Sequence, residues 1–172
     1  GGETFTELTY EGYAPGGVAV FVECMTDNLN RTVSNVRHRF SKMGGNLATT
    51  GSVAFLFERK GIFILPKHET LDEEMLIFEL IDEVAEDVDT EEGIITITTS
   101  MEDFGNMQKK LEGMGLETEN ASLQRIPKNY IDTDKDTASK VLKMIDYLED
   151  DEDVQEVYHN MGITDSVIEL MS

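Results

Sequence analysis

The sequence has little cysteine, little proline and little positive charge, and each scarcity removes a class of protein. Of its 172 residues, one is Cys, three are Pro and 14 are Lys or Arg, against 35 Asp or Glu. Because Cys24 is the single cysteine, the chain forms no internal disulfide, which favours a reducing compartment; we expect the cytoplasm. The longest apolar runs, Val18–Val22 and Ile62–Leu65, are far shorter than the ~20 residues of a membrane-spanning helix, so no membrane partner is expected. The first residues, Gly1 to Thr4, lack signal-peptide character and an initiator Met, as in a fragment.

What is present is typical of a folded, acidic protein. Hydrophobic residues make up 40% of the chain and charged residues 28%, and the net charge is −21. The charge is unevenly distributed: residues 1–60 carry six basic and six acidic groups, whereas residues 61–172 carry 8 basic and 29 acidic groups. A polyanion is repelled by the second part. Any contact with nucleic acid is therefore expected in the first sixty residues or in a segment missing from this chain.

The first part of the sequence predicts strands around one helix. The β-branched and aromatic run over 17–24 predicts a buried strand. A helix is expected over 28–43, because apolar residues recur there at helical spacing and Gly44 can end it. These apolar residues are Val33, Val36, Phe40 and Met43. Alternation over 52–58, a turn at Arg59-Lys60-Gly61 and the run 62–65 together predict a hairpin.

The middle of the sequence predicts a second sheet with helices. A capping box formed by Thr70 and Glu73 starts a helix that runs to about residue 83. A strand is expected over 94–99, a second helix after Ser100 and an extended segment over 116–126. This alternation is typical of a compact sheet with helices on one face.

The end of the sequence predicts elements that need a partner elsewhere. A helix after Asp132 and a short strand over 154–158 cannot bury themselves. We therefore predict an α+β fold of two α/β domains, one inserted in the other. Residues 1–66 and 129–172 form the discontinuous domain, and 67–128 form the inserted, ferredoxin-like domain.

The polar face of the helix over 28–43 is the candidate nucleic-acid surface. Arginine and lysine bind phosphates, and asparagine and arginine also read base edges. The candidate residues are Arg31, Asn35, Arg37, His38, Arg39 and Lys42. An ordinary solvated helix face is the alternative interpretation of the same residues.

A glycine-rich segment over 10–17 is a second candidate contact surface. It precedes a strand and has no lysine, whereas a phosphate-binding loop follows a strand and opens a helix, so nucleotide binding is not expected. Its tyrosines and glycines suit contact with protein or RNA, with Tyr13 available to stack on a base, and a structural turn is the alternative. The candidate residues are Tyr10, Tyr13, Gly16 and Gly17.

Metal binding and catalysis find no support in the sequence. His38, His68 and His159 are scattered, and no Cys or His pair has the spacing of zinc ligands. The acidic run Glu149–Asp153 lacks the spaced oxygens and glycine of a calcium loop, and we interpret it as a solvated turn. No Gly-x-Ser-x-Gly motif is present. The expectation is a protein that is no enzyme and holds neither a metal nor a cofactor.

Four groups of residues carry a family resemblance. They are Tyr10–Gly17, Thr26–Thr32, Gly44–Leu47 with Gly51–Val53, and Leu148–Asp150 with Asp153–Asn160. They resemble motifs of the YebC/PmpR family, whose members are described as probable transcriptional regulators. Its mitochondrial relatives are translational activators of a cytochrome oxidase subunit, and some bacterial relatives resemble ribosome-associated translation factors. The family fold has an N-terminal three-helix domain and two α/β domains, one inserted in the other; the basic N-terminal domain is absent from this chain.

The resemblance implies a non-enzymatic regulator of gene expression that binds DNA. Two alternatives stay open: a ribosome-associated translation factor that contacts ribosomal RNA, and a protein-interaction scaffold without nucleic-acid contact. The expected partner is DNA or ribosomal RNA, bound mainly through the missing N-terminal domain. Basic proteins are further expected partners of the acidic domain.

Overall fold

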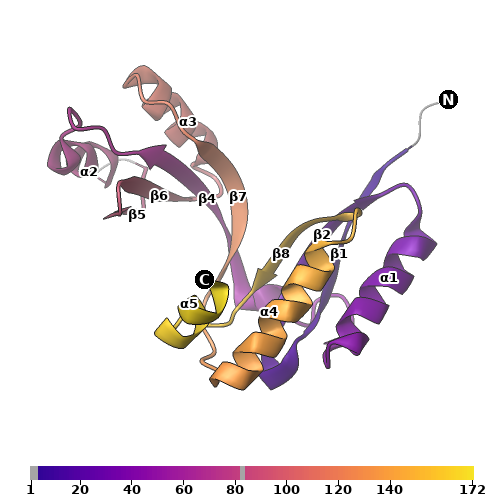
Figure 1. The fold of residues 1–172 in the computed structure, drawn as a ribbon. Helices are drawn as coiled ribbons and strands as arrows, with labels where there is room; N and C mark the ends of the chain where they lie inside the picture. The colour runs from indigo at the N-terminus through magenta and orange to yellow at the C-terminus, as the bar shows by residue number, and fades with distance from the viewer. Residues whose placement is uncertain (1–3, 82–83) are drawn as a thin grey trace. The chain divides into compact units, whose positions relative to one another are not determined.

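The structure is a computed structural model that describes residues 4–81 and 84–172. It divides into two compact units, and each is described by itself. Unit 1 consists of Gly1–Phe57 and Pro127–Ser172, and unit 2 of Glu58–Ile126. Both units combine an antiparallel sheet with helices, which confirms the predicted α+β class (Figure 1).

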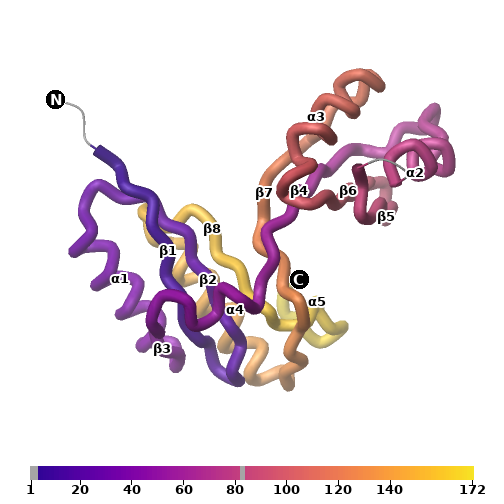
Figure 2. The backbone as a smooth tube through the Cα atoms, turned by 180° about the vertical axis from the view of Figure 1, so that it is seen from behind, coloured from indigo at the N-terminus to yellow at the C-terminus, as the bar shows by residue number. Residues whose placement is uncertain are grey.

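Unit 1 is a four-stranded sheet in the order β3-β1-β2-β8, with α1 and α4 on one face (Figures 1 and 2). Its two segments meet where β2 pairs with β8, for example Phe21 opposite Tyr158. Its elements are β1 (Thr6–Tyr13), the short helix η1 (Pro15–Gly17), β2 (Ala19–Thr26), α1 (Leu29–Lys42), β3 (Asn46–Leu47), the short helix η2 (Ala54–Leu56), α4 (Lys135–Glu149), β8 (Val154–His159) and α5 (Asp165–Met171). The predicted helix over 28–43 and the predicted strand over 154–158 are both present.

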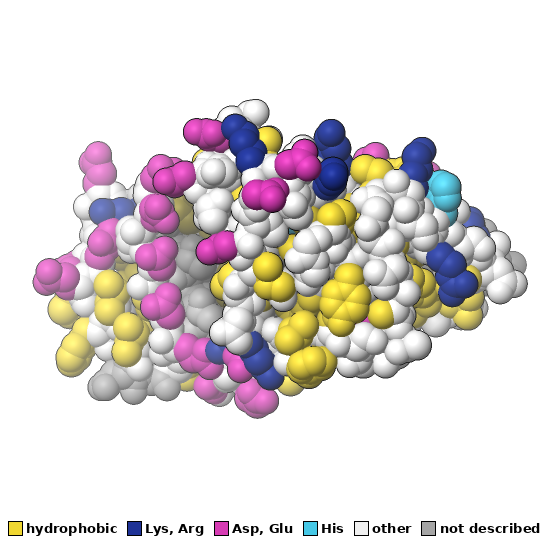
Figure 3. Space-filling model, turned by 90° about the horizontal axis from the view of Figure 1, so that it is seen from below, with side chains coloured by type: hydrophobic (Ala, Val, Ile, Leu, Met, Phe, Trp, Pro, Cys, Tyr) yellow, Lys and Arg dark blue, Asp and Glu magenta, His cyan; other side chains and the backbone are white. Residues whose placement is uncertain are grey.

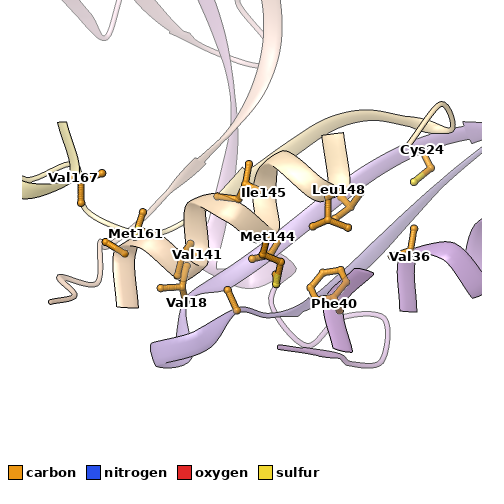
Figure 4. Packing of buried hydrophobic residues seen from close by; sticks show 14 residues of the cluster. Val18, Cys24, Val36, Phe40, Val141, Met144, Ile145, Leu148, Met161 and Val167 are labelled. Atoms are coloured by element: carbon orange, nitrogen blue, oxygen red, sulfur yellow. The ribbon is translucent and has the colours of Figure 1, made fainter. Parts of the chain in front are cut away.

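The core of unit 1 lies between this sheet and the two helices. Phe40 of α1 and Met144 of α4 are fully buried, and Figure 4 shows their side chains facing the same interior. On α1 the buried residues are Thr32, Val36 and Phe40, whereas the predicted Val33 and Met43 are half-buried. The apolar stripe predicted from the sequence is therefore correct in position but narrower than expected.

Unit 2 is a four-stranded sheet in the order β5-β6-β4-β7. Its elements are β4 (Phe57–Pro66), α2 (Glu73–Ile81), β5 (Asp87–Glu91), β6 (Ile94–Ser100), α3 (Phe104–Gly113) and β7 (Asn120–Pro127). Leu76 and Leu80 of α2 pack with Met107 and Leu111 of α3 in one cluster over Phe63 and its neighbours. A βαββαβ chain with this strand order is a ferredoxin-like fold.

The predicted hairpin over 52–65 is wrong. β4 runs without a turn through Arg59, Lys60 and Gly61 and pairs with β6 over Lys60–Pro66. Gly61 is needed for packing, because a Cβ there would lie 2.8 Å from Phe104 and closer still to the Thr99 hydroxyl. A glycine inside a strand can thus mark a close approach instead of a turn.

The course of β4 moves the boundaries of the inserted unit. We predicted 67–128, whereas the structure gives Glu58–Ile126. The difference arises because β4 supplies the first strand of the βαββαβ order, which the predicted segment lacked. The predicted discontinuous domain, 1–66 with 129–172, correspondingly loses β4.

Candidate nucleic-acid interface

The polar face of α1 is set by its cap and by its packing on the sheet of unit 1. The Asn28 side chain accepts the Arg31 N–H and starts the helix where β2 ends. Of the candidate residues, Arg31, Arg37, His38 and Lys42 are exposed, whereas Asn35 and Arg39 are half-buried. The helix carries Arg39 and Lys42 in its last turn, where cations interact favourably with the helix dipole.

Arg31 is bound by carboxylates of its own chain. Its Nε donates to Asp153 Oδ2 at 3.2 Å, and its Nη2 donates to Asp153 Oδ1 at 2.8 Å. The same Nη2 lies 2.9 Å from Asp27 Oδ1. Asp153 also accepts the Thr32 hydroxyl at 2.8 Å. Hydrogen bonding by Arg31 holds the pKa of the Asp153 carboxyl below its usual range.

Arg39 is bound in a similar way, two turns further along α1. Its Nε lies 3.4 Å from Asp151 Oδ2, and its Nη1 donates to the Tyr147 carbonyl oxygen. The guanidinium also lies 4.3 Å from the centroid of the Tyr147 ring. Two of the predicted phosphate-binding arginines thus join α1 to α4 and to the turn before β8.

The acidic turn Glu149–Asp153 is not the solvated turn that we predicted. Asp151 and Asp153 are both 6% exposed, whereas Asp150 and Glu152 are exposed. Burial of Asp153 is offset by its two hydrogen bonds from Arg31. Asp151 accepts the Asp153 N–H at 2.9 Å through Oδ1, whereas its Oδ2 receives no hydrogen bond from the described residues and is neutralised by the ion pair with Arg39. Along this turn, exposed and buried carboxylates therefore alternate, and only the buried ones contribute to packing.

The side chains of His38 and Lys42 lie close to Tyr147 of α4. His38 lies edge-on to the Tyr147 ring at 6.4 Å, and the Lys42 ammonium lies 5.4 Å from the ring centroid. Lys143 is exposed and lies one turn before Tyr147 on α4, so both side chains occupy one side of that helix. Figure 3 shows dark blue Lys and Arg side chains beside a histidine at the right-hand end of the view.

Three exposed cations of α1 and α4 have no carboxylate partner among the described residues. Within residues 4–81 and 84–172, no ion pair involves Arg37, Lys42 or Lys143. We use the name α1–α4 cationic surface for the exposed side of α1, with Arg37, His38 and Lys42, together with the adjoining side of α4, with Lys143 and Tyr147. Sequence reasoning missed Tyr147 and, with it, Lys143 one turn earlier on α4, because the contact of Tyr147 with α1 depends on how α4 packs.

The predicted glycine-rich loop over 10–17 consists of the end of β1, up to Tyr13, and the short helix η1 (Pro15–Gly17). Tyr10 and Tyr13 belong to β1 and are half-buried, Tyr10 against the main core and Tyr13 against a smaller cluster around Phe21. Gly16 and Gly17 form the exposed turn, with φ of 78° and 77°. Because residues other than glycine rarely adopt positive φ, the backbone conformation of this turn is sufficient to explain the two glycines.

Glu11 is a structural residue that sequence reasoning did not single out. The side chain is buried, and its carboxylate accepts backbone N–H groups of Gly51, Val53 and Ala54 at 2.6, 2.9 and 2.6 Å. These bonds fix the segment after β3 against the sheet. No ligand is required to satisfy this carboxylate.

Two side chains suited to acid–base or nucleophilic chemistry, Cys24 and His159, are buried and half-buried in unit 1. Burial raises the pKa of the Cys24 thiol to about 12 and lowers the pKa of His159, whose Nδ1 accepts the Met161 N–H at 3.1 Å. In the part of the chain that the structure describes, no three His, Cys, Asp or Glu residues group as metal ligands. Among the same residues, no helix has the length and apolar character needed to cross a bilayer.

Comparison with known proteins shows the family. Residues 5–161 match the family model described as "TACO1/YebC second and third domain". A protein of Amoebophilus asiaticus is 54% identical over 160 residues, and one of Hathewaya histolytica is 50% identical over 159; both are named probable transcriptional regulatory proteins. The alignments cover 92% of this chain and 66% and 65% of those proteins. The chain therefore spans about two thirds of the length of these relatives.

A solved structure agrees with this assignment. The crystal structure of a conserved hypothetical protein from Aquifex aeolicus superposes with a TM-score of 0.83 at 44% sequence identity. The match covers 94% of this chain and 66% of that one. The resemblance seen in the sequence is thereby confirmed. With its two-unit fold, its matched domains and relatives about half identical to it, the chain belongs to the TACO1/YebC family, many of whose members are named probable transcriptional regulatory proteins.

Proposed function

We propose that this chain is part of a non-enzymatic regulator of gene expression and contacts nucleic acid through the α1–α4 cationic surface. The observation that carries the proposal is the set of exposed cations, Arg37, Lys42 and Lys143, which have no carboxylate partner in the described residues of a chain with net charge −21. The names of the relatives support a regulatory role. The expected partner is DNA.

The chemistry of this surface suits phosphates better than base edges. Arg37 and Lys42 offer charged donors to phosphate oxygens. Asn35, by contrast, is half-buried, and Arg31 and Arg39 are held by Asp153 and Asp151. Tyr147 is covered on its face by Arg39 and is no free platform for base stacking. Binding is therefore expected to depend strongly on salt and weakly on base sequence.

Oligonucleotide binding by the chain of 172 residues tests the proposal. We expect a labelled DNA duplex to bind at about 50 mM salt and to lose affinity at least about tenfold when Arg37→Glu and Lys42→Glu are combined. Each cation that contacts duplex phosphates contributes about 0.9 to the slope of log K against log salt, so the double variant should lower that slope by about 1.8. Fluorescence anisotropy measures both quantities.

A matched control separates this surface from net charge. Lys109→Glu combined with Lys135→Glu makes the same charge change at two exposed lysines elsewhere. We expect this control to lower DNA affinity less than threefold. Equal losses in the two double variants would contradict a specific role for the α1–α4 cationic surface.

The same assay decides between the alternatives left open by the sequence. A structured ribosomal RNA fragment that binds at least tenfold more tightly than DNA, with the same loss in the Arg37→Glu/Lys42→Glu variant, would replace DNA by RNA as the partner. Binding to neither nucleic acid would overturn the proposal and leave the protein-interaction scaffold.

A further inference from the structure

A stripe of exposed apolar side chains runs along α2 in unit 2. Met75, Phe78 and Ile81 are 55%, 71% and 48% exposed, and Phe78 is the most exposed large hydrophobic residue in the described part of the chain. At 100° per residue, the three side chains fall within a sector of about 120°. Leu76 and Leu80 occupy the opposite side and are buried in the core. α2 thus has a second apolar face that its own unit does not cover.

Carboxylates border this stripe. Glu74 lies one turn before Phe78, and Glu79 lies one turn after Met75, so each is a surface neighbour of an apolar residue. Both glutamates are exposed, and neither has an ion-pair partner within residues 4–81 and 84–172. We call the five residues Glu74, Met75, Phe78, Glu79 and Ile81 the α2 stripe.

The net charge of unit 2 adds to the negative charge of these two glutamates. The sequence of Glu58–Ile126 contains six Lys or Arg and 18 Asp or Glu, a net charge of −12. Two of the six cations, Lys60 and Lys67, already pair with Glu86 and Glu73. Such a surface repels nucleic acid, an anionic membrane and a second copy of itself, and it attracts a cationic partner.

We propose that the α2 stripe docks a lysine- or arginine-rich amphipathic helix of a protein partner. The apolar face of that helix would cover Met75, Phe78 and Ile81, which stand at i, i+3 and i+6. Its cations would lie beside Glu74 and Glu79. This inference does not rest on the proposed function, because it concerns another unit and another class of partner.

A designed peptide probes the stripe directly. The probe is a synthetic helix of roughly 18 residues, built from leucine on one face and lysine on the other; a scrambled peptide of the same composition is the control. We expect NMR spectra of the isotope-labelled chain to shift at α2 with the amphipathic peptide. The scrambled peptide should bind at least about tenfold more weakly, because burial of the apolar face is lost.

Matched variants locate the contact. Phe78→Ser should weaken peptide binding at least about tenfold, whereas Phe55→Ser removes an aromatic of unit 1 that is 64% exposed and should change binding less than twofold. Glu74→Gln with Glu79→Gln should reduce the salt dependence more than Glu117→Gln with Glu119→Gln, which removes the same charge at two exposed positions of unit 2.

The outcomes separate this proposal from its competitors. Peptide shifts spread over the acidic surface and insensitive to Phe78→Ser would overturn it. A concentration-dependent dimer that Phe78→Ser dissolves would assign the stripe to a second copy and would also overturn it. Oligonucleotide affinity should be the same in Phe78→Ser and the parent chain, so failure of the α1–α4 cationic surface is recognised separately.

Discussion

The two units of this molecule place their carboxylates differently. In unit 1, Glu11, Asp151 and Asp153 are buried at 3%, 6% and 6% exposure, and each binds named donors of the same unit. In the described residues of unit 2, no carboxylate is buried, and the one buried polar residue is Thr99. Both units carry negative net charge, yet in unit 1 part of that charge serves to hold the fold.

The two units differ because they offer different numbers of cations to pair with their carboxylates. In unit 1, Arg31 and Arg39 stand two turns apart on α1 and match Asp153 and Asp151 on the turn before β8. The cost of burying a carboxylate is offset by these pairs and by backbone donors. Unit 2 has one cation for every three carboxylates, so most of its acidic side chains stay in water. Carboxylates that meet a cation or a backbone donor are thus part of the packed fold, whereas carboxylates without one stay in water.

Substitution of Glu11 is expected to give the largest loss of stability, and the absence of that loss would contradict the comparison between the units. Glu11→Ala removes the acceptor of three backbone N–H groups in a buried position, and we expect the free energy of unfolding to fall by about 3 kcal/mol. Urea unfolding followed by circular dichroism measures the loss. Glu7→Ala, on the exposed start of the same strand, is the control and should change stability by less than about 0.5 kcal/mol.

A smaller loss, with a defined pH dependence, is expected at Asp153. Asp153→Asn removes a charge-assisted pair with an arginine that is itself 46% exposed, so we expect about 2 kcal/mol at neutral pH. Because the folded pKa of Asp153 is lowered, its contribution is complete above the unfolded value of 3.8 and is lost as pH falls through the folded pKa. The stability difference between parent and variant should therefore be constant above pH ~5 and shrink below pH ~4.

The control for this pair is Glu152→Gln, which changes the exposed residue between the two buried aspartates. Its effect should stay below about 0.5 kcal/mol at every pH above 5. If Asp153→Asn behaves like Glu152→Gln, the Arg31–Asp153 pair contributes nothing to stability and the contrast between the units disappears.

The smallest effect is expected in unit 2. Asp89 and Glu91 alternate on the exposed side of β5, where they have no ion-pair partner among the described residues. Asp89→Asn with Glu91→Gln should change the free energy of unfolding by less than about 0.5 kcal/mol, in either direction. A loss above 1.5 kcal/mol would show that unit 2 also uses its carboxylates to fold.

Much of the fold follows from local sequence. The α1 helix was predicted because apolar residues such as Val36 and Phe40 recur at helical spacing, and both are buried as expected. Such signals lie within about four residues of one another, and the chain can satisfy them without knowledge of its tertiary structure. The strand β6 and the helix α3 followed from signals of the same range.

The errors arose where one residue type serves two purposes. Gly61 follows two charged residues, as a turn glycine does, but it lies in β4 beneath Phe104. The acidic run before β8 has the composition of a solvated turn, but alternate members face Arg31 and Arg39. In both cases the deciding neighbour is more than 35 residues away along the chain, beyond the range of any local pattern.

The sequence alone determined the α+β class, the discontinuous layout, the position of α1 and the uneven charge, because propensity, periodicity and composition are properties of short segments or of simple counts. Only the tertiary structure decided which cations stay available. It joined Arg31 and Arg39 to the buried carboxylates of Asp153 and Asp151, and it brought Tyr147 of α4 beside Lys42. The physical reason is that the interaction energy of a charged side chain depends on the neighbouring charges and on its exposure to water. Both are fixed only when distant segments pack together.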